Sequence, residues 1–326
     1  RDAMQQLGKN SGVLNANDPE INKQLSSKHP QRGELNGCST TSMPTPAEYD
    51  MPEAHLPGTE GYIEVSVDRI QRKAARLKTE RAKGPAGDYN EHMAPYGRMH
   101  PRGSPEEAAV EDFAFFVELY VNARLPAWYY RLSAAARLVP LLKPEWDGTG
   151  TPPARPIAVG GIERRFCCGL LVEIHAADFA DYLGPDQVAV GITASVEKLV
   201  FGIRALLERR PDFACWQIDL RNAFNQFQRA LLPGRFAEAP PRLRRLLPFV
   251  CALLGPGAPL TTGIRPTQPA GASGSDSSSS TCTAWAEFES QEGTQQGCPL
   301  GPALFCMWFM PHMRWIQAQI QAKCGP

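Results

Sequence analysis

The chain has 326 residues, 43% of them apolar, which is enough to bury one large core or two modest ones. Lysine plus arginine and aspartate plus glutamate each total 34, so the formal net charge is zero. A neutral chain lacks the global basic surplus that is usual in nucleic-acid enzymes. The nine cysteines include no Cys-x2-Cys pair, which argues against a zinc knuckle or a disulfide framework and fits a reducing compartment.

The N-terminal part of the chain is polar. Residues 1–62 are rich in Asn, Gln, Ser, Pro and Gly without hydrophobic periodicity, so we predict a disordered region or a linker. Residues 63–100 are predicted to form a basic helix with a connector, because Ile70, Ala74 and Leu77 share one face of a cation-rich run. The charged face of this helix either contacts nucleic acid or is simply solvated.

Residues 101–210 are predicted to be mostly helical. The run SPEE at 104–107 supplies an N-cap serine, a proline at the first helical position and a glutamate three residues after the cap. Residues 155–160 then have the pattern of an edge strand that tolerates a proline near its start. Helices are expected over 163–182 and 193–209, the second with one apolar face.

Residues 211–326 are predicted to begin with a strand from Phe213 to Leu220 and a helix over 223–232. The low-complexity stretch 255–281 predicts a flexible surface insertion. A strand over 285–289 and a helical region over 300–323, interrupted near Pro311, complete the chain. Strands that alternate with helices in this way favour an α+β fold.

The first candidate for chemistry is a carboxylate at the end of a predicted strand. The run DLRNAFN occupies 219–225, so Asp219 would offer a hard oxygen ligand for Mg2+ on a rigid element, although such a residue is more often a cap or turn. Asn222 and Ala223 would turn backbone N–H groups of the next helix toward an anion. The ring of Phe224 would lie beneath a sugar or pack in the core.

A second candidate is the turn that opens the last predicted helix, with the sequence GTQQGCPLGPALF over 293–305. Gly293 and Gly297 would let a ligand approach the backbone closely, and Gln295 and Gln296 offer amides for sugar or base contacts. A glycine- and proline-rich loop is weak evidence alone, but this ordered string is far more specific.

Positive charge is concentrated near the first of these motifs. The segment 201–250 contains nine arginines, no lysine and four acidic residues, a local surplus of five positive charges. A phosphate backbone would favour such a footprint. Arginines scattered over solvated helix faces would give the same count, and composition does not separate the two interpretations.

In this order, the motifs resemble those of the reverse-transcriptase domain of non-LTR (LINE-type) retrotransposons. The run at 293–305 resembles motif B of that family, and the run at 219–225 resembles motif A. Lys143-Pro144 with Arg155-Pro156-Ile157 resembles the fingers motif, whose cations grip the incoming triphosphate. The run QVAVG at 187–191 resembles the next block, which approaches the template strand.

The resemblance covers roughly residues 100–310 and implies a right-hand polymerase architecture. Residues 101–210 would be a fingers-like region and residues 211–326 a partial palm. The implied activity is an RNA-directed DNA polymerase, which adds deoxynucleoside triphosphates to a DNA primer 3′-hydroxyl on an RNA template with two Mg2+ ions. We expect an intracellular protein of the nucleus or a cytoplasmic ribonucleoprotein, without a membrane partner, since no signal peptide or long apolar stretch is present.

The resemblance also implies residue roles. Asp219 and the carbonyl of Leu220 would bind the metal, and Phe224 would be the steric gate that favours deoxynucleotides. The incoming nucleotide would contact Lys143, Arg155, Asn222, Ala223, Phe224, Gln296 and Gly297. The template-primer would contact Gln187, Gly191 and Pro302.

The chain also departs from the family pattern. Motif C, an aromatic-x-Asp-Asp hairpin, is missing, since no Asp-Asp pair occurs after residue 305, and no thumb follows. We therefore expect a truncated or decayed copy without polymerase activity, with an incomplete palm sheet that leaves an unpaired edge and exposed apolar surface. The alternatives are a non-catalytic RNA- or DNA-binding remnant of a retroelement and a pseudogene product that folds poorly.

Overall fold

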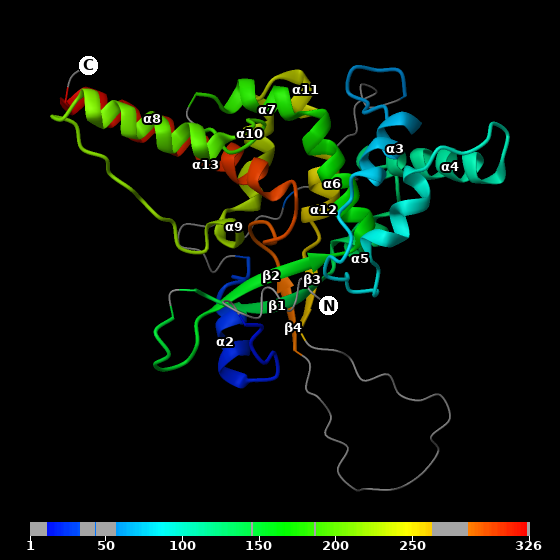
Figure 1. Ribbon diagram of the computed structural model, residues 1–326, viewed down its shortest axis with the longest axis horizontal. Coiled ribbons are helices and arrows are strands. Elements are labelled where there is room, and N and C mark those ends of the chain that lie inside the picture. Colours follow the sequence, from blue (N-terminus) through cyan, green and yellow to red (C-terminus); the bar gives the residue numbers. More distant parts are fainter. Residues whose placement is uncertain are drawn as a thin grey trace, which may run out of the picture.

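The computed structural model describes residues 12–32, 43, 57–144, 146–185, 187–262 and 286–324. Helices form a body at one end of the molecule, and a small sheet projects from it at the other end (Figure 1). The sheet has four strands in the order β2-β1-β3-β4 and is mixed, with one parallel and two antiparallel pairings. This mixed architecture of helices and a small open sheet is compatible with the predicted α+β class.

The sheet is built from β1 (Ala136–Leu142), β2 (Ala154–Gly160), β3 (Ala258–Thr262) and β4 (Glu287–Ser290). Strand β2 confirms the predicted edge strand, and its Pro156 lies opposite Pro140 of β1. Strand β3 lies inside the stretch 255–281, so the prediction of a flexible insertion is wrong for 258–262, while 263–281 lie outside the described residues. Alternate residues of β3 are buried, which is the pattern of a strand with one face on a core.

The helical body contains one 3-10 helix of eight residues, one single-turn 3-10 helix and several α-helices. Their bounds are α3 (Val67–Ala75), η2 (Asn90–Gly97), α4 (Pro105–Val121), α5 (Ala127–Ala134), α6 (Ile162–Ile174), α7 (Ala176–Leu183), α8 (Ser195–Arg209), α9 (Ala223–Gln226), η3 (Arg229–Leu231), α10 (Leu232–Glu238), α11 (Pro241–Arg244), α12 (Leu247–Leu254) and α13 (Gly301–Cys324). None of the described helices is long and apolar enough to cross a bilayer.

Sequence signals such as caps and prolines predicted the ends of some of these helices correctly and the ends of others incorrectly. The predicted start of α4 is confirmed, because the Ser104 hydroxyl accepts a hydrogen bond from the Glu107 N–H at 3.1 Å. The helix predicted over 223–232 begins at Ala223 as predicted but is not continuous, because the extended backbone at Phe227 separates α9 from η3. The interruption predicted near Pro311 is also wrong, since α13 is continuous through this proline, which removes only one backbone donor from a long helix.

The core of the helical body forms around α12, in which every residue from Leu247 to Leu254 is buried. Helices that are apolar on all sides are stable only when other elements surround them. Here α5 and α4 lie alongside, and Tyr120 of α4 meets Phe249 edge to face, with 5.2 Å between ring centroids. Cys167 and Cys168 of α6 are fully buried in the same core, as small apolar side chains.

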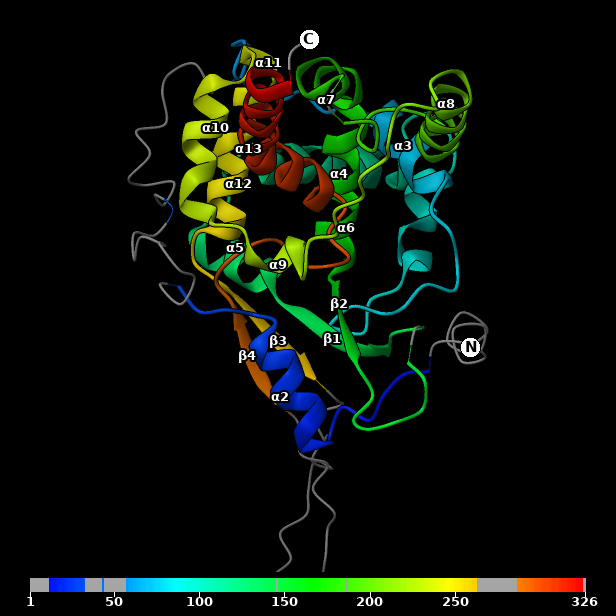
Figure 2. The same ribbon diagram turned by 90° about the vertical axis from the view of Figure 1, so that its left-hand side faces the viewer.

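Helix α2 (Pro19–Ser27) lies within the segment predicted to be disordered, so that prediction is wrong for these residues. The Asp18 carboxylate caps the helix by accepting from the Glu20 N–H at 2.9 Å. Ile21 and Leu25, one helical turn apart, are buried against the sheet together with Phe288 of β4. Figure 2 shows α2 lying across the sheet, away from the helical body.

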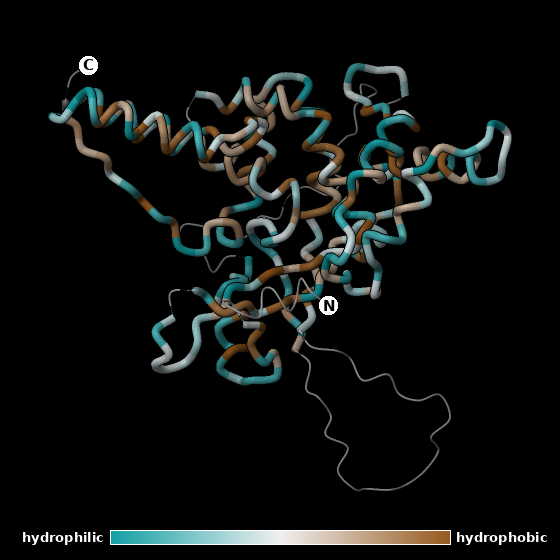
Figure 3. The backbone as a smooth tube through the Cα atoms, viewed as in Figure 1, coloured by the Kyte–Doolittle hydropathy of each residue, from teal (hydrophilic) through white to brown (hydrophobic). Residues whose placement is uncertain are grey.

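An arm formed by α8 and the segment Phe213–Leu220 projects from the helical body (Figure 1). No residue of α8 is buried, although its apolar residues share one face, and Figure 3 shows apolar positions along the whole arm. The predicted strand Phe213–Leu220 is wrong in the described part of the chain, because the segment is extended but pairs with no strand. Trp216 in this segment is 84% exposed.

Helix α2 is held to the sheet by few apolar contacts, so one truncation should release it. We predict that Leu25→Ala, at a side chain with no exposed area, weakens docking of α2 by about 2–5 kcal/mol. Hydrogen exchange of amides 20–28 should rise strongly while exchange in α12 stays unchanged. Ser26→Ala, at an exposed position on the same helix, is the matched control, and equal exchange in the two variants would contradict the assignment of α2 to the fold.

Candidate functional site

Two segments that the sequence analysis singled out are bonded to each other through their backbones. The Thr294 N–H donates to the Phe224 carbonyl at 2.6 Å, and the Gly293 N–H donates to the Phe227 carbonyl at 2.8 Å. Gly293 has φ +61°, and a Cβ there would lie 2.2 Å from the Phe224 carbonyl oxygen. Only glycine fits this contact. The DLRNAFN turn and the loop over 290–301 therefore form one unit.

The guanidinium of Arg229 holds this unit together from inside. Arg229 is 2% exposed, and its three nitrogens donate to the carbonyls of Gly293 and Leu254 and to the Ser290 hydroxyl, each at 2.7 Å. The Glu292 carboxylate accepts from the Arg229 backbone N–H at 2.9 Å and supplies a neighbouring negative charge. Burial lowers the pKa of Arg229, and the charge of Glu292 partly offsets this effect.

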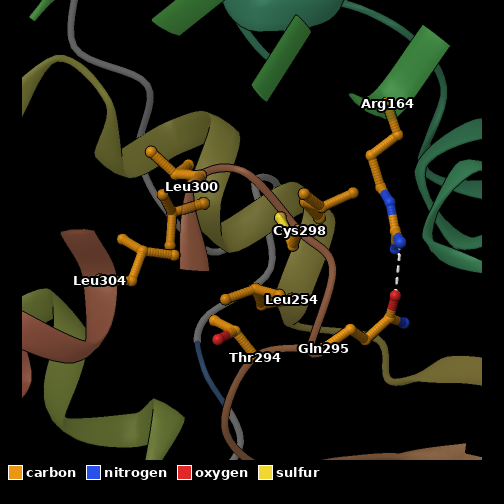
Figure 4. A pocket seen from close by; sticks show the side chains of 9 residues that line it. Arg164, Leu254, Thr294, Gln295, Cys298, Leu300 and Leu304 are labelled. Carbon is orange, nitrogen blue, oxygen red and sulfur yellow. Dashed lines mark hydrogen bonds between the residues drawn. The ribbon is translucent and has the colours of Figure 1, made fainter. Parts of the chain in front are cut away.

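A second buried arginine fixes the middle of the same loop. Arg164 of α6 donates to the Ala134 carbonyl at 2.7 Å and to the Gln295 side-chain oxygen, and the Gln295 amide donates to the same Ala134 carbonyl at 2.9 Å (Figure 4). The Gln296 carbonyl in turn accepts from the Ala158 N–H of β2 at 2.7 Å. The loop is thus tied to α5, α6 and β2, and the side chain of Gln295 serves the fold.

Cys298 lies in this loop at the start of α13, beside a cavity of about 10 Å3 that Arg164, Thr294 and Gln295 also line (Figure 4). Such a volume holds at most a single water molecule, so it is not a ligand pocket. A hydrogen bond from the buried Cys168 thiol and the N–H groups of Leu300 and Gly301 lower the pKa of Cys298.

Four cations from four segments meet where β2 begins. Lys143 and Arg155 were predicted from sequence, and Lys28 and Arg221 join them, since the charges of Lys143, Arg221 and Arg155 all lower the pKa of Lys28 after the larger effect of burial. Hydrogen bonds to main-chain carbonyls connect their segments. The Lys28 ammonium donates to the Ala154 carbonyl, and the backbone N–H of Lys143 donates to the Pro153 carbonyl at 3.0 Å.

The turn after Asp219 is hydrogen-bonded to Lys28 of this cluster. Asn222 has left-handed backbone geometry (φ 53°) before α9, and its side-chain amide donates to the Lys28 carbonyl at 2.8 Å. Ala223 begins α9, and the half-buried ring of Phe224 packs on Phe305 of α13 with 5.3 Å between centroids. The predicted nucleotide contacts of the first motif therefore lie next to the cation cluster, and the ring of Phe224 is held by packing.

The predicted metal ligands are placed differently. Asp219 and Leu220 are exposed at the end of the unpaired segment Phe213–Leu220. No group of three or more His, Cys, Asp or Glu residues that could hold a metal ion occurs in the part of the chain that the structure describes. Two Mg2+ ions at close distance need several carboxylates on rigid elements. The described residues do not fit such a site.

Two of the three predicted template-primer residues, Gln187 and Gly191, serve the fold where they lie. The Gln187 side-chain oxygen accepts from the Ala189 and Val190 N–H groups at 2.9 and 2.8 Å, which closes a local turn. Gly191 has φ +76°, and a Cβ there would lie 2.2 Å from the Ala176 carbonyl of α7. Pro302 and Gly297 are exposed at the entry of α13. Nothing in the described contacts joins Gln187 and Gly191 to the cation cluster.

The arginine surplus over 201–250 is largely used within the fold. Arg229 is buried, Arg210 pairs with Asp212 at 2.7 Å, and the Arg244 guanidinium donates to the Ala239 carbonyl at 2.6 Å. Arg235 and Arg242 lie 4.0 and 3.8 Å from the carboxylates of Glu238 and Asp178. Five of the nine arginines in this segment are therefore buried or bonded within the protein, and their presence does not require a phosphate backbone as partner. The basic helix α3 behaves in the same way, since its buried Lys73 pairs with Glu173 at 2.6 Å.

The residues that organise the site were not visible in the sequence. Arg229 and Arg164 have no local motif, and their role appears only when three or more segments meet around them. Lys28 ends a helix whose apolar side is only one turn long, which is too short for a periodicity signal.

Comparison with known proteins leaves the resemblance resting on the motifs alone. No protein-family model matches the chain, and no curated protein matches it.

Removal of the Arg229 guanidinium should destabilise the whole site. We predict that Arg229→Met lowers the free energy of unfolding by about 3–5 kcal/mol, because two carbonyls and the Ser290 hydroxyl lose a buried donor and Glu292 loses a neighbouring positive charge. Arg229→Lys should not restore this energy, since an ammonium cannot reproduce the planar set of donors. Urea denaturation measures the effect. Arg210→Met, at an exposed ion pair, is the control and should change stability by less than about 1 kcal/mol.

Docking of α2 should weaken in acid through His29. This ring is buried, Nδ1 lies 2.9 Å from the Leu25 carbonyl, and Nε2 has no partner. Burial, and then the charges of Arg229 and Lys28, lower the pKa of His29 below its usual 6.5. The unfolded segment therefore binds the proton first, and stability that is complete above pH 6.5 falls as the pH drops through the folded pKa.

The measurement for His29 is hydrogen exchange of amides 20–28 between pH 7.5 and 5, corrected for the intrinsic rate at each pH. Protection should decline below pH 6.5 in the parent chain and stay constant in His29→Gln. The same decline in the glutamine variant would show that another group is responsible.

Proposed function

We propose that this chain is the nucleotide-binding part of an RNA-directed DNA polymerase related to the reverse transcriptases of non-LTR retrotransposons. In the complete enzyme, the primer 3′-hydroxyl attacks the α-phosphorus of a deoxynucleoside triphosphate, and pyrophosphate leaves. The fingers and partial-palm assignment of 101–210 and 211–326 belongs to this proposal, as do an RNA template, a DNA primer and a nuclear or ribonucleoprotein location.

The observation that carries the proposal is the convergence of three motifs that are far apart in the sequence. The cations Lys143 and Arg155 lie at the start of β2, where Lys28 connects them to Asn222. Asn222 precedes Phe224, whose carbonyl is bonded to Thr294 in the loop over 290–301. The same loop bonds back to β2 through Gln296 and Ala158. A triphosphate, a sugar and a base could each meet residues of the predicted type along this path.

Each residue at this site would have a definite task. Arg155 would hold phosphate oxygens with two parallel donors, and Lys143 would add a point charge. Phe224, held against Phe305, would exclude a 2′-hydroxyl by its bulk, and Ala223 leaves room beside it. Gln296 and Gly297 would contact the incoming nucleotide, and Pro302 would support the template-primer at the entry of α13.

Magnesium would activate the attacking hydroxyl and stabilise the leaving oxygen in the complete enzyme. The exposed Asp219, with the Leu220 carbonyl, does not make a two-ion site in the described part of the chain. We therefore expect this chain to bind nucleotides without extending a primer.

A direct test is binding of dATP by equilibrium dialysis, with Arg155→Ala as the site variant. The parent chain should bind, and Arg155→Ala should weaken binding about 10- to 100-fold, the effect of losing a charged double hydrogen bond. Arg204→Ala, which removes an exposed arginine of α8, is the matched control and should bind as the parent does. Absence of dATP binding, or equal binding by both variants, would contradict the proposal.

A second candidate function is non-catalytic binding of single-stranded nucleic acid by the arm. The rings of Phe213 and Trp216 are exposed on extended backbone, and the guanidinium of Arg210 lies 4.0 Å from the Phe213 ring centroid. Exposed rings on an extended segment are a stacking platform for bases. Salt-dependent binding of a uridine homopolymer that Trp216→Ser weakens, without binding of dATP, would favour this function over the first.

A further inference from the structure

The four cations at the start of β2 have no acidic partner in the part of the chain that the structure describes. Lys28 is half-buried at the end of α2, Lys143 follows β1, Arg155 is exposed in β2, and Arg221 is exposed just before the turn at Asn222. None of them forms an ion pair with a carboxylate among the described residues, where seven such pairs occur elsewhere. Like charges gathered in this way repel each other unless an anion lies between them.

Lys28 is the member of the cluster that the fold holds most firmly. Its ammonium donates to the Ala154 carbonyl, which belongs to the peptide bond that continues into Arg155. Its own carbonyl accepts from Asn222, the neighbour of Arg221. Both ends of Lys28 are therefore fixed, one beside each arginine of the cluster.

Helix α2 is anchored to β2 at the same place. The Gln24 side chain accepts from the Ala154 N–H at 2.9 Å and donates to the Pro152 carbonyl at 3.2 Å, as a neighbouring strand would do. These bonds satisfy the edge of β2 and set the position of the next turn of α2, which carries Lys28. The N-terminal helix is thus built into the cluster by side-chain bonds to the backbone of the strand.

The arrangement favours a compact polyanion. The charges come from four segments and lie near the start of one strand, whereas a nucleic-acid backbone needs cations distributed along a track. A linear triphosphate carries several negative charges within a few bonds and can meet all four cations together.

We propose that Lys28 is a phosphate-binding residue, so that helix α2 supplies a fourth cation to a triphosphate site shared with Lys143, Arg155 and Arg221. This inference rests on the proposed nucleotide site and extends it to a helix outside the region that resembles the family. The ammonium of Lys28 would exchange or share its bond to the Ala154 carbonyl with a phosphate oxygen. Because the ligand then bridges α2 and β2, binding also stabilises the docked helix.

The test is calorimetric titration of the full chain with inorganic tripolyphosphate at fixed ionic strength. Lys28→Gln should weaken binding about tenfold, which corresponds to one charge-assisted hydrogen bond. Lys28→Arg keeps the charge and should bind within about threefold of the parent. Lys23→Gln, an exposed position on the same helix, is the matched control and should leave binding unchanged. Hydrogen exchange of amides 20–28 in each free variant shows whether α2 remains docked.

The outcomes separate the two proposals. Normal binding by Lys28→Gln with loss of binding in Arg155→Gln would overturn the role of Lys28 and leave the nucleotide site standing. No tripolyphosphate binding by the parent chain, or no effect of any variant, would remove the nucleotide site and the role of Lys28 together. Tripolyphosphate that fails to protect α2 from exchange in the parent chain would contradict the bridge between α2 and β2. Displacement of tripolyphosphate by a uridine homopolymer at equal phosphate concentration would show a nucleic-acid track and overturn the triphosphate assignment.

Discussion

The buried guanidinium of Arg229 is the contact on which the arrangement of the site depends. It joins η3, the end of α12, the end of β4 and the loop after β4, none of which shares a helix or strand ladder with the others here. Irregular backbone in a protein interior must have its polar groups satisfied, and a planar set of donors can serve several carbonyls at once. The cost of removing this charge from water is offset only because the donors of all three nitrogens find acceptors.

Arg164 is a second buried arginine that donates hydrogen bonds to this loop, a few residues further along the chain. It ties Gln295 to α5, and Gln296 bonds to β2 through its main chain. The loop over 290–301 is thereby fixed at its start, middle and end by interior contacts, while Gly297, Pro299 and Pro302 stay exposed. A loop with a rigid inner side and an accessible outer side can present backbone and amide groups to a ligand without rearrangement.

Sequence patterns predicted the parts of the fold whose cause is local. The α4 start follows from Ser104, and β2 follows from a short run of branched and apolar residues after a turn. The strand Phe213–Leu220 failed because extended backbone becomes a strand only with a partner, which an apolar pattern cannot supply. Helix α2 was not predicted, because its two buried apolar residues, Ile21 and Leu25, give no measurable periodicity. They form a small core only together with residues of the sheet.

The candidate site shows the same division between local and tertiary causes. Resemblance placed Lys143, Arg155, Asn222 and Phe224 in one functional set. The charges of Lys143 and Arg155 act on Lys28, whose carbonyl accepts from Asn222. Lys28 and Arg229 could not be predicted, because the first acts through a helix from a distant segment and the second acts through main-chain carbonyls. Asp219 was placed at the end of a strand predicted from an apolar run, but that segment has no strand partner among the described residues.

The segment Phe213–Leu220 bears on two requirements of a polymerase, which must bind a triphosphate and also hold a catalytic carboxylate in place. Fixing one backbone residue costs roughly 1–2 kcal/mol in conformational entropy, so ordering Phe213–Leu220 is a substantial free-energy demand. Among the described residues, the hydrogen bonds that tie this part of the chain to Lys28 and to the loop over 290–301 begin at Asn222, so they do not hold Phe213–Leu220. A catalytic carboxylate must be held within roughly 0.5 Å of its working position. In the proposed function, binding of the triphosphate would not by itself position the Asp219 carboxylate, and an added strand along Phe213–Leu220 would be needed to hold it.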